Sequence, residues 1–451
     1  MRRSTLIRSM DYAKFFTHES SRRKPSAIRA LQPLVNLPGM ISLGGGMPNS
    51  ALFPFKKIAY TLDDGSVIET TTAELNTALQ YSPTPGLPEL CHRLNVMQKT
   101  EHQPPNYPGG ISIAVVPGSQ DGLAKIFDML ISEEDTLLIE APTYSGTLAA
   151  LEAKGCNLVG VPTDDNGLNP DSLRNILDNW NEKTDGRKPR VLYTIPTGAN
   201  PTGASMPIER KQDVYKTAQK HNMIIVEDDP YYYMQFSNKR TPSFFSIDID
   251  GRVLRTDSFS KILSSGVRVG VVTGPKELVE QMNLHNQATI MHTSGIAQHT
   301  VLTVLKHWGV GDLPDGINEV NGDIIPAGKY PKWEAHLENL KQFYSSQCDA
   351  FMKAADKHLV DENGESLAEY KRPTAGMFVW MKLNGINDTT ELIMTEAVSK
   401  KVLLVPGSAF YPGSPKSSYV RAAFSVASHE QMDTAMQRLG EMLRDVKVKS
   451  C

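Results

Sequence analysis

The sequence predicts an α/β protein built on a mainly parallel β-sheet. From Ile111 onward, short apolar runs alternate with amphipathic helical stretches, and turn-forming or polar residues directly follow those runs. Strands that alternate with helices pair in parallel, and the helices cover both faces of the sheet. Ligands of such sheets bind at the carboxyl ends of the strands. The residues that follow each run are therefore the first candidates for a functional site.

The expected elements of the first part follow one another regularly. The helix after the first run begins at Ser119, after a Pro-Gly turn, and buries Leu123, Ile126, Phe127 and Leu130 on one face. The other runs are three to seven residues long, which suits strands. The expected strands are residues 111–116, 136–140, 157–162, 190–195, 223–226, 253–255 and 267–273.

After Gly274 the pattern changes. Residues 309–330 have no periodicity and are expected to be a loop or insertion. Beyond them we expect helices at 331–358, near 391–400 and from 429, and strands at 377–383, 402–405 and 419–424. The expected organisation is an N-terminal arm (1–50) that joins the small domain, a large domain (51–330) and a smaller α+β domain (331–451).

The composition is that of an ordinary globular protein. The 451 residues include 47 basic and 50 acidic ones, and this near balance gives no indication of a nucleic-acid or membrane partner. No apolar run approaches the length of a transmembrane helix. The four cysteines are widely scattered, without CxxC or metal-like spacing, and are expected to be free thiols in a reducing, intracellular compartment. No metal is expected.

The N-terminus allows two interpretations. Arg2, Arg3 and Arg8 precede the first acidic residue, Asp11, as in a short mitochondrial targeting segment. Alternatively, Met10 is the true start and the first nine residues are dispensable. The compartment is therefore the mitochondrial matrix or the cytoplasm.

The loop around Lys261 is the strongest chemical signal. Ser258, Ser260 and Lys261 follow an apolar run, and Arg268 comes seven residues after the lysine. Such a lysine can bind an aldehyde covalently, while the hydroxyls and the guanidinium hold a phosphate. Pyridoxal 5′-phosphate (PLP) requires both. By itself, the SxSK pattern favours an ordinary exposed lysine in a serine-rich loop, so the interpretation depends on the rest of the chain.

Other strand ends carry weaker signals. Ser119-Gln120 could simply begin a helix, Asn200-Pro-Thr-Gly could be a turn, and Asp228 with Tyr231 could be a helix cap and a packed ring. Their occurrence together, in one order and at corresponding strand ends, favours a common function.

Together with Tyr144, these residues resemble a fold type I PLP-dependent aminotransferase. The segments RKPSAIR, ISLGGGMPN, LQYSPTPG, VEDDPYYYMQF, AGMFVWMK and VPGSAFY are similar to those of kynurenine/α-aminoadipate aminotransferases and of the related fungal aromatic aminotransferases. The resemblance extends from about Tyr12 to the final helix. It implies a large domain with a mainly parallel seven-stranded sheet.

The resemblance also implies a role for each cofactor-binding residue. Lys261 would bind PLP covalently and then move the substrate proton, and Asp228 would keep the pyridine nitrogen protonated. The other expected ligands are Tyr231 and Asn200 at the phenolic oxygen, Tyr144 on the ring face, Ser119, Gln120, Ser258, Ser260 and Arg268 at the phosphate, and Tyr81 of the partner subunit, also at the phosphate. A homodimer is implied because the site needs both chains.

The substrate contacts implied by the resemblance are fewer. Arg421 would bind the α-carboxylate in bidentate geometry, with Asn200 beside it. Arg29 in the arm would meet the substrate side chain, although that arm is basic throughout, and Gly46 would allow close approach of the backbone. The expected reaction is transfer of an amino group from α-aminoadipate, kynurenine or an aromatic amino acid to 2-oxoglutarate.

Two alternatives compete with this reaction. A PLP-dependent β-lyase or decarboxylase on the same fold would turn over without a keto-acid acceptor. A transcriptional regulator with an aminotransferase-like domain would need a DNA-binding module before the arm. Only about ten residues are available there, and this second alternative is rejected.

Overall fold

The computed structural model describes residues 10–28, 31, 34, 37–41, 43–44, 46–312 and 330–450, without the side chains of 447–450. The chain divides into two compact units. The first comprises residues up to 131 and 245–335, and the second comprises residues 132–244 and 336–451. The predicted division into an arm, a large domain and a small domain stays a prediction.

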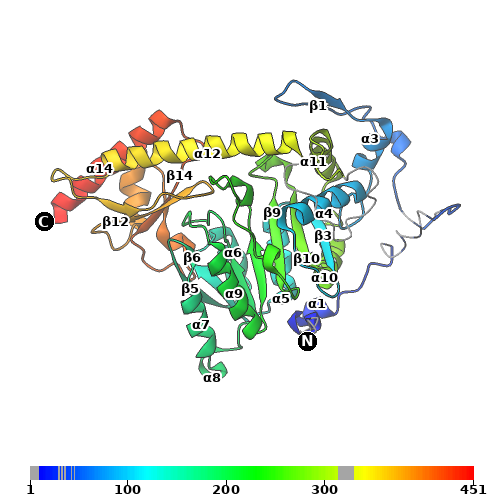
Figure 1. Cartoon of the computed structure of the whole chain (residues 1–451), viewed down its shortest axis with the longest axis horizontal. Helices are drawn as coiled ribbons and strands as arrows, with labels where there is room; N and C mark the ends of the chain where they lie inside the picture. Colours follow the sequence, from blue (N-terminus) through cyan, green and yellow to red (C-terminus); the bar gives the residue numbers. More distant parts are fainter. Residues whose placement is uncertain are drawn as a thin grey trace, which may run out of the picture. The chain divides into compact units, whose positions relative to one another are not determined.

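The first unit combines a three-stranded sheet with helices (Figure 1). The strand order is β3-β10-β9, and β10 runs antiparallel to both neighbours. A separate antiparallel hairpin is formed by β1 and β2. The strands are β1 (Ala59–Thr61), β2 (Val67–Glu69), β3 (Ile111–Val116), β9 (Val253–Ser258) and β10 (Gly270–Pro275). The helices are α1 (His18–Ser21), α3 (Thr72–Leu79), α4 (Pro88–His102), α5 (Ser119–Leu130), α10 (Lys276–Thr289) and α11 (Gly295–His307).

The second unit contains five more strands, in the order β8-β7-β4-β5-β6. The pairs β8–β7, β7–β4 and β4–β5 are parallel, as the alternation of strands and helices predicts. The strands are β4 (Thr136–Ala141), β5 (Asn157–Asp164), β6 (Gly167–Leu168), β7 (Val191–Thr194) and β8 (Ile224–Asp228). The helices of this part are α6 (Ser145–Glu152), α7 (Pro170–Asp178), α8 (Glu182–Asp185) and α9 (Ile208–Lys220).

The C-terminal part of the second unit is a four-stranded antiparallel sheet of order β11-β12-β14-β13. Helices α12 and α14 pack against it through a core that includes Phe351, Val379, Val420 and Met436 (Figure 1). The strands are β11 (Ala368–Tyr370), β12 (Phe378–Leu383), β13 (Val405–Pro406) and β14 (Tyr419–Ala423). The helices are α12 (Pro331–His358), α13 (Thr390–Leu392), which continues as a π-helical turn (Ile393–Ala397), and α14 (His429–Ser450).

The α/β fold class is confirmed, and three expected details differ. The first unit has the strands β3, β10 and β9 and the second unit has five strands, whereas the resemblance implied seven in one sheet, and β6 is only a two-residue antiparallel strand. The strand expected at 267–273 begins only at Gly270, because Arg268 has a left-handed φ of 51° that strand pairing does not permit. Of the strand expected at 402–405 only Val405 pairs, together with the following residue, Pro406.

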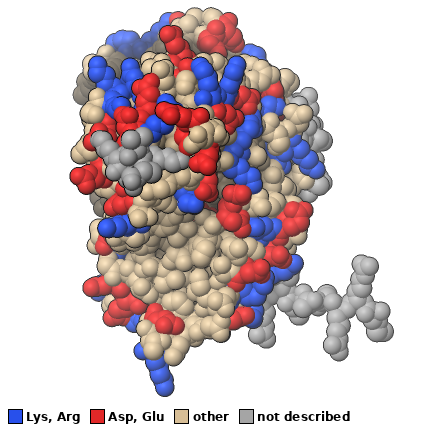
Figure 2. Space-filling model, turned by 90° about the vertical axis from the view of Figure 1, so that its left-hand side faces the viewer, with Lys and Arg blue, Asp and Glu red and all other residues tan. Residues whose placement is uncertain are grey.

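Charged side chains of both signs are intermixed over the upper part of the face shown in Figure 2, whereas its lower central part is largely uncharged. This mixing agrees with the near balance of acidic and basic residues in the sequence. Within the described ranges, none of the helices combines the length and the apolar character needed to cross a membrane. Cys91, Cys156 and Cys348 are free thiols, and Cys451 lies outside the described residues.

Candidate active site

The loop after β9 places the lysine as the sequence predicts. Ser258 is the last residue of β9, and its Oγ accepts a hydrogen bond from the backbone N–H of Ser260 at 3.2 Å. Lys261 follows and is half-buried. Burial, together with the positive charge of Arg268, lowers the pKa of the Lys261 amine. A lowered pKa increases the neutral fraction of the amine, and the neutral amine is the nucleophile for an aldehyde.

Arg268 joins this loop to the start of helix α5. Its Nη1 donates to the Ser260 hydroxyl at 3.2 Å, and its Nη2 donates to the carbonyl of Pro117, also at 3.2 Å. A side chain at Gly118 would place its Cβ 2.2 Å from that Nη2, and one at Gly270 would lie 2.7 Å from the backbone nitrogen of Ser119. The glycines therefore let the guanidinium and the first N–H groups of the helix lie close together. A cationic side chain beside a helix N-terminus is suited to a phosphate.

The other predicted residues of the first unit are less informative. Tyr81 is 48% exposed, and its ring meets His292 edge-on with a centroid distance of 6.0 Å. Gly46 is exposed, and a Cβ built there has no atom within 4 Å. Arg29 lies outside the described residues. The predicted roles of all three stay predictions.

In the second unit, Asp228 ends strand β8 and is only 3% exposed. Its Oδ2 accepts a hydrogen bond from the Tyr193 hydroxyl at 2.9 Å. Tyr231 follows in the same loop, is buried, and packs edge-on against the Phe378 ring at 5.9 Å. Burial and the nearby Asp228 carboxylate raise the pKa of the Tyr231 hydroxyl, so that it stays protonated and can donate to an anionic oxygen.

Arg421 on β14 has the surroundings of a carboxylate-binding arginine. Its guanidinium carbon lies 4.5 Å from the centre of the Phe378 ring and 5.1 Å from that of Phe410. Its Nη1 donates to Asn200 Oδ1 at 3.0 Å, whereas its buried Nε has no hydrogen-bond partner among the described residues. An unsatisfied, desolvated guanidinium donor is costly, and an anionic ligand would satisfy it.

Tyr144 lies at the N-terminus of α6, directly after the strand-to-helix turn. Its ring folds over the first helical turn, where a Cβ on Gly146 would lie 2.4 Å from the ring carbon Cζ. Gly146 is thus the residue that makes room for the ring. The structure brings Tyr144, Asn200, Asp228, Tyr231 and Arg421 into one unit, and the lysine loop with the α5 N-terminus into the other.

A buried carboxyl lies next to this set on strand β4. Glu140 accepts hydrogen bonds from the Thr194 hydroxyl at 2.6 Å and from the backbone N–H of Ile195 at 3.2 Å. Burial, with a further contribution from the Asp228 charge, raises the pKa of Glu140 from 4.5 to about 7. Its neutral form is therefore favoured in the folded protein.

Because this folded-state pKa is raised, the stability that Glu140 contributes is complete below pH 4.5 and is lost as the pH rises through about 7. Glu140→Gln carries no charge at any pH. We expect the free energy of unfolding of the variant to fall less between pH 4.5 and 8 than that of the native protein, by about 3 kcal/mol. Urea unfolding at several pH values measures this difference. Glu209→Gln, at an exposed position of α9, is the control, and equal slopes for the native and Glu140→Gln proteins would contradict the prediction.

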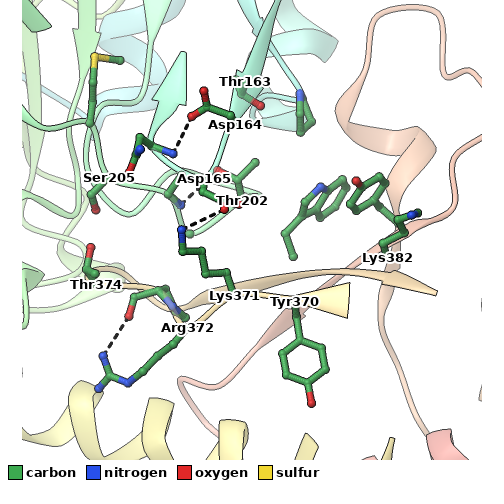
Figure 3. Close-up of a pocket in the computed structure, with 18 of the residues that line it drawn as sticks. Thr163, Asp164, Asp165, Thr202, Ser205, Tyr370, Lys371, Arg372, Thr374 and Lys382 are labelled. Atoms are coloured by element: carbon green, nitrogen blue, oxygen red, sulfur yellow. Dashed lines mark hydrogen bonds and ion pairs between the residues drawn. The ribbon is translucent and has the colours of Figure 1, made fainter. Parts of the chain in front are cut away.

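A separate cavity of about 640 Å³ lies within the second unit (Figure 3). None of the predicted site residues lines it, although Thr202 and Gly203 of the Asn200 loop do. Figure 3 shows Lys371 directed at Asp165, at 2.9 Å. All six charged residues of the lining are engaged in ion pairs, namely Asp164–Arg210, Asp165–Lys371, Glu369–Lys382 and Arg372–Asp349. The cavity therefore offers no uncompensated charge for an anionic ligand.

The two residue sets fit a phosphorylated aldehyde and a carboxylate. The first contains an amine with a lowered pKa and a guanidinium at a helix N-terminus where glycines leave room. The second contains a buried carboxylate, a protonated tyrosine and an arginine whose Nε has no partner within the described ranges. Residues 40–311 match the model of the family described as aminotransferase class I and II, and the chain belongs to this family. It is a PLP-dependent aminotransferase.

Several known aminotransferases are similar to this chain over nearly its whole length. The chain is 42% identical over 448 residues to the mitochondrial kynurenine/α-aminoadipate aminotransferase of Mus musculus, covering 97% of this chain and 100% of the relative. The crystal structure of aminotransferase Aro8 from Candida albicans is 26% identical, with a TM-score of 0.81 and coverage of 97% and 99%. The kynurenine aminotransferase of Pyrococcus horikoshii, solved with PMP, is also 26% identical, with a TM-score of 0.72 and coverage of 97% and 98%. The resemblance seen in the sequence is confirmed.

Sequence reasoning missed several residues that shape the second set. Phe378 and Phe410 enclose the Arg421 guanidinium, and Tyr193 contacts Asp228, but each is an aromatic residue that no local pattern marks as part of a site. In the sequence, the signals for these contacts are the hydroxyl of Tyr193 and the carboxyl of Glu140, which are polar groups within otherwise apolar strands. Buried polar groups need partners, and these two positions pointed to a network.

Proposed function

We propose that the protein transfers the amino group of L-α-aminoadipate, kynurenine or an aromatic L-amino acid to 2-oxoglutarate, in a two-stage ping-pong reaction that yields a 2-oxo acid and glutamate. The observation that carries this proposal is the Arg421 guanidinium, which is held between two rings while its buried Nε has no hydrogen-bond partner in the described part of the chain. All of these substrates have an α-carboxylate. The relatives named for kynurenine, α-aminoadipate and aromatic amino acids support the choice of donors.

The family resemblance implies the cofactor contact that each residue would make. Arg268, Ser258, Ser260 and the N–H groups at Ser119 and Gln120 would bind the phosphate. When bound, PLP withdraws electrons from the substrate Cα. Lys261 would take the proton from Cα and return it at C4′, and its lowered pKa supports this role.

The remaining residues would orient the ring and the substrate. Asp228 would hold the proton on the pyridine nitrogen, Tyr231 and Asn200 would donate to the phenolic oxygen, and Tyr144 would lie on the ring face. Arg421 would fix the α-carboxylate so that the Cα–H bond faces the ring, and Asn200, already its hydrogen-bond partner, would hold it in place.

We also propose a homodimer in which Tyr81 reaches the phosphate bound by the partner subunit. The exposed hydroxyl-bearing ring of Tyr81 supports this role, because an exposed aromatic side chain is available to a second chain. Sedimentation equilibrium of the purified protein tests the oligomeric state, and a monomer at micromolar concentration would contradict it.

A donor panel distinguishes the proposed reaction from its alternative. Each amino acid is mixed with the loaded enzyme, first without and then with 2-oxoglutarate, while the cofactor absorbance and the glutamate formed are followed. A transaminase stops after one half-reaction without the acceptor. A β-lyase or decarboxylase would continue to turn over without it, and that outcome would overturn the proposal.

The arm supplies a prediction about donor selectivity. Arg29→Ala should weaken the interaction of the enzyme with acidic donors by about 1.5–3 kcal/mol, the range of a charged hydrogen bond. The interaction with aromatic donors should not change, because their rings would pack at this position instead. The arm would close over the substrate and exclude water during proton transfer. The measurement is kcat/KM for α-aminoadipate and for phenylalanine. Arg22→Ala, an exposed arginine of the same arm, is the control. Equal losses for both donors would show that Arg29 is structural.

The compartment is the mitochondrial matrix or the cytoplasm. Mitochondrial relatives and the arginines among the first nine residues support the matrix, whereas a start at Met10 supports the cytoplasm. Fractionation of the native cells, with N-terminal sequencing of the recovered protein, distinguishes the two.

A further inference from the structure

A chain of hydrogen bonds runs behind the Asp228 carboxylate. The Thr147 hydroxyl donates to the Tyr193 hydroxyl at 3.0 Å, and the Tyr193 hydroxyl donates to Asp228 Oδ2 at 2.9 Å. Thr147 and Tyr193 are fully buried, and Asp228 is 3% exposed. Bulk water therefore does not compete for these groups, and each hydrogen bond is stronger than it would be at the surface.

The fold fixes all three members in place. Strands β7 and β8 pair in parallel with Tyr193 opposite Val226, and Asp228 lies two residues further along β8. Because side chains alternate between the two faces of a strand, Tyr193 and Asp228 project to the same face. Thr147 lies in the first turn of α6, where its backbone N–H donates to the carbonyl of Tyr144 at 3.1 Å. The chain thus connects a helix start and two neighbouring strands.

The direction of these hydrogen bonds has a chemical consequence. Burial, together with the Asp228 charge, raises the pKa of Tyr193 well above its ordinary value, so that the phenol remains a donor. A hydrogen bond donated to a carboxylate stabilises its ionised form, whereas burial alone would favour the neutral acid. A donor on Oδ2 also fixes the rotation of the carboxylate about its Cβ–Cγ bond.

We infer that Tyr193, held by Thr147, is a positioning residue that keeps the Asp228 carboxylate ionised and oriented toward the pyridine nitrogen of PLP. This inference rests on the role proposed for Asp228. If the Tyr193 donor is removed, Asp228 becomes more basic. The shared proton then lies on the carboxylate and no longer on the ring nitrogen, and the ring withdraws electrons less effectively.

Nitrogen-15 NMR of the enzyme loaded with PLP labelled at the pyridine nitrogen tests this directly. In Tyr193→Phe the resonance should move from the protonated toward the unprotonated position, and kcat should fall by about tenfold to a hundredfold. Thr147→Val should shift the resonance in the same direction by less, and Thr147→Ser, which keeps the hydroxyl, should restore it. Tyr107→Phe is the matched control, because Tyr107 is buried and its hydroxyl has no hydrogen-bond partner among the described residues.

Asp228→Asn, measured in the same way, separates two kinds of failure. An unchanged resonance in Tyr193→Phe, beside a clear shift in Asp228→Asn, would overturn the inference and leave the role of Asp228 intact. A protonated ring nitrogen in Asp228→Asn would refute the role of Asp228 itself. If Tyr193→Phe does not fold, the comparison of Thr147→Val with Thr147→Ser decides, and identical resonances in these two variants would overturn the inference.

Discussion

Replacing Lys261 by alanine is expected to lower kcat by about 10²–10⁴-fold, the range that a positioned proton-transfer group supplies. The variant should still bind PLP, because the phosphate ligands proposed around Arg268 remain, but it should lose the covalent link. Absorbance spectra of the loaded protein report that link. Lys276→Ala, at the exposed start of α10, is the control and should behave as the native enzyme.

Borohydride reduction makes the lysine assignment independent of turnover. Treatment of the loaded native enzyme, followed by proteolysis and mass spectrometry, should place the pyridoxyl label on the peptide that contains Lys261. Its half-buried position and lowered pKa are the physical reasons why this amine reacts in preference to exposed lysines. A label on another lysine would refute the assignment.

The second large effect is expected for Asp228→Asn. The neutral amide cannot balance a positive charge on the pyridine nitrogen, and the loss of such a preorganised electrostatic interaction lowers turnover by about 10²-fold or more. The measurement is the rate constant of the half-reaction in single-turnover experiments with a saturating donor.

The neighbouring acids provide the comparison for Asp228. Glu227 precedes it on β8 and projects to the opposite face, where its Oε1 accepts a hydrogen bond from the backbone N–H of Phe244 at 2.7 Å. Asp229 follows it and is also buried. If Asp228→Asn keeps nearly native turnover, one of these two acids would be the true partner of the ring, or the ring nitrogen is not protonated.

The sequence by itself determined the fold class, the family and the order of the chemical groups along the chain. Local signals were sufficient, because alternating apolar runs specify strands and helices, and a ligand-binding residue such as Lys261 or Asp228 directly follows such a run. The main strands and the starts of helices α5, α12 and α14 lie where the patterns predict them. The sequence patterns do not predict two short irregularities, at Arg268 and at 402–405, because a left-handed turn and an unpaired edge have no periodic signal.

The tertiary structure alone decided which groups meet. Arg421 and its partner Asn200 are separated by 221 positions, and the two rings that enclose the guanidinium come from elsewhere in the chain. In the sequence, Tyr193 is one of many residues in apolar runs. Only the parallel register of β7 and β8 brings its hydroxyl to Asp228. Periodicity reports which face of an element is buried, but the partners of a buried polar group are fixed by long-range packing, and no local pattern contains that information.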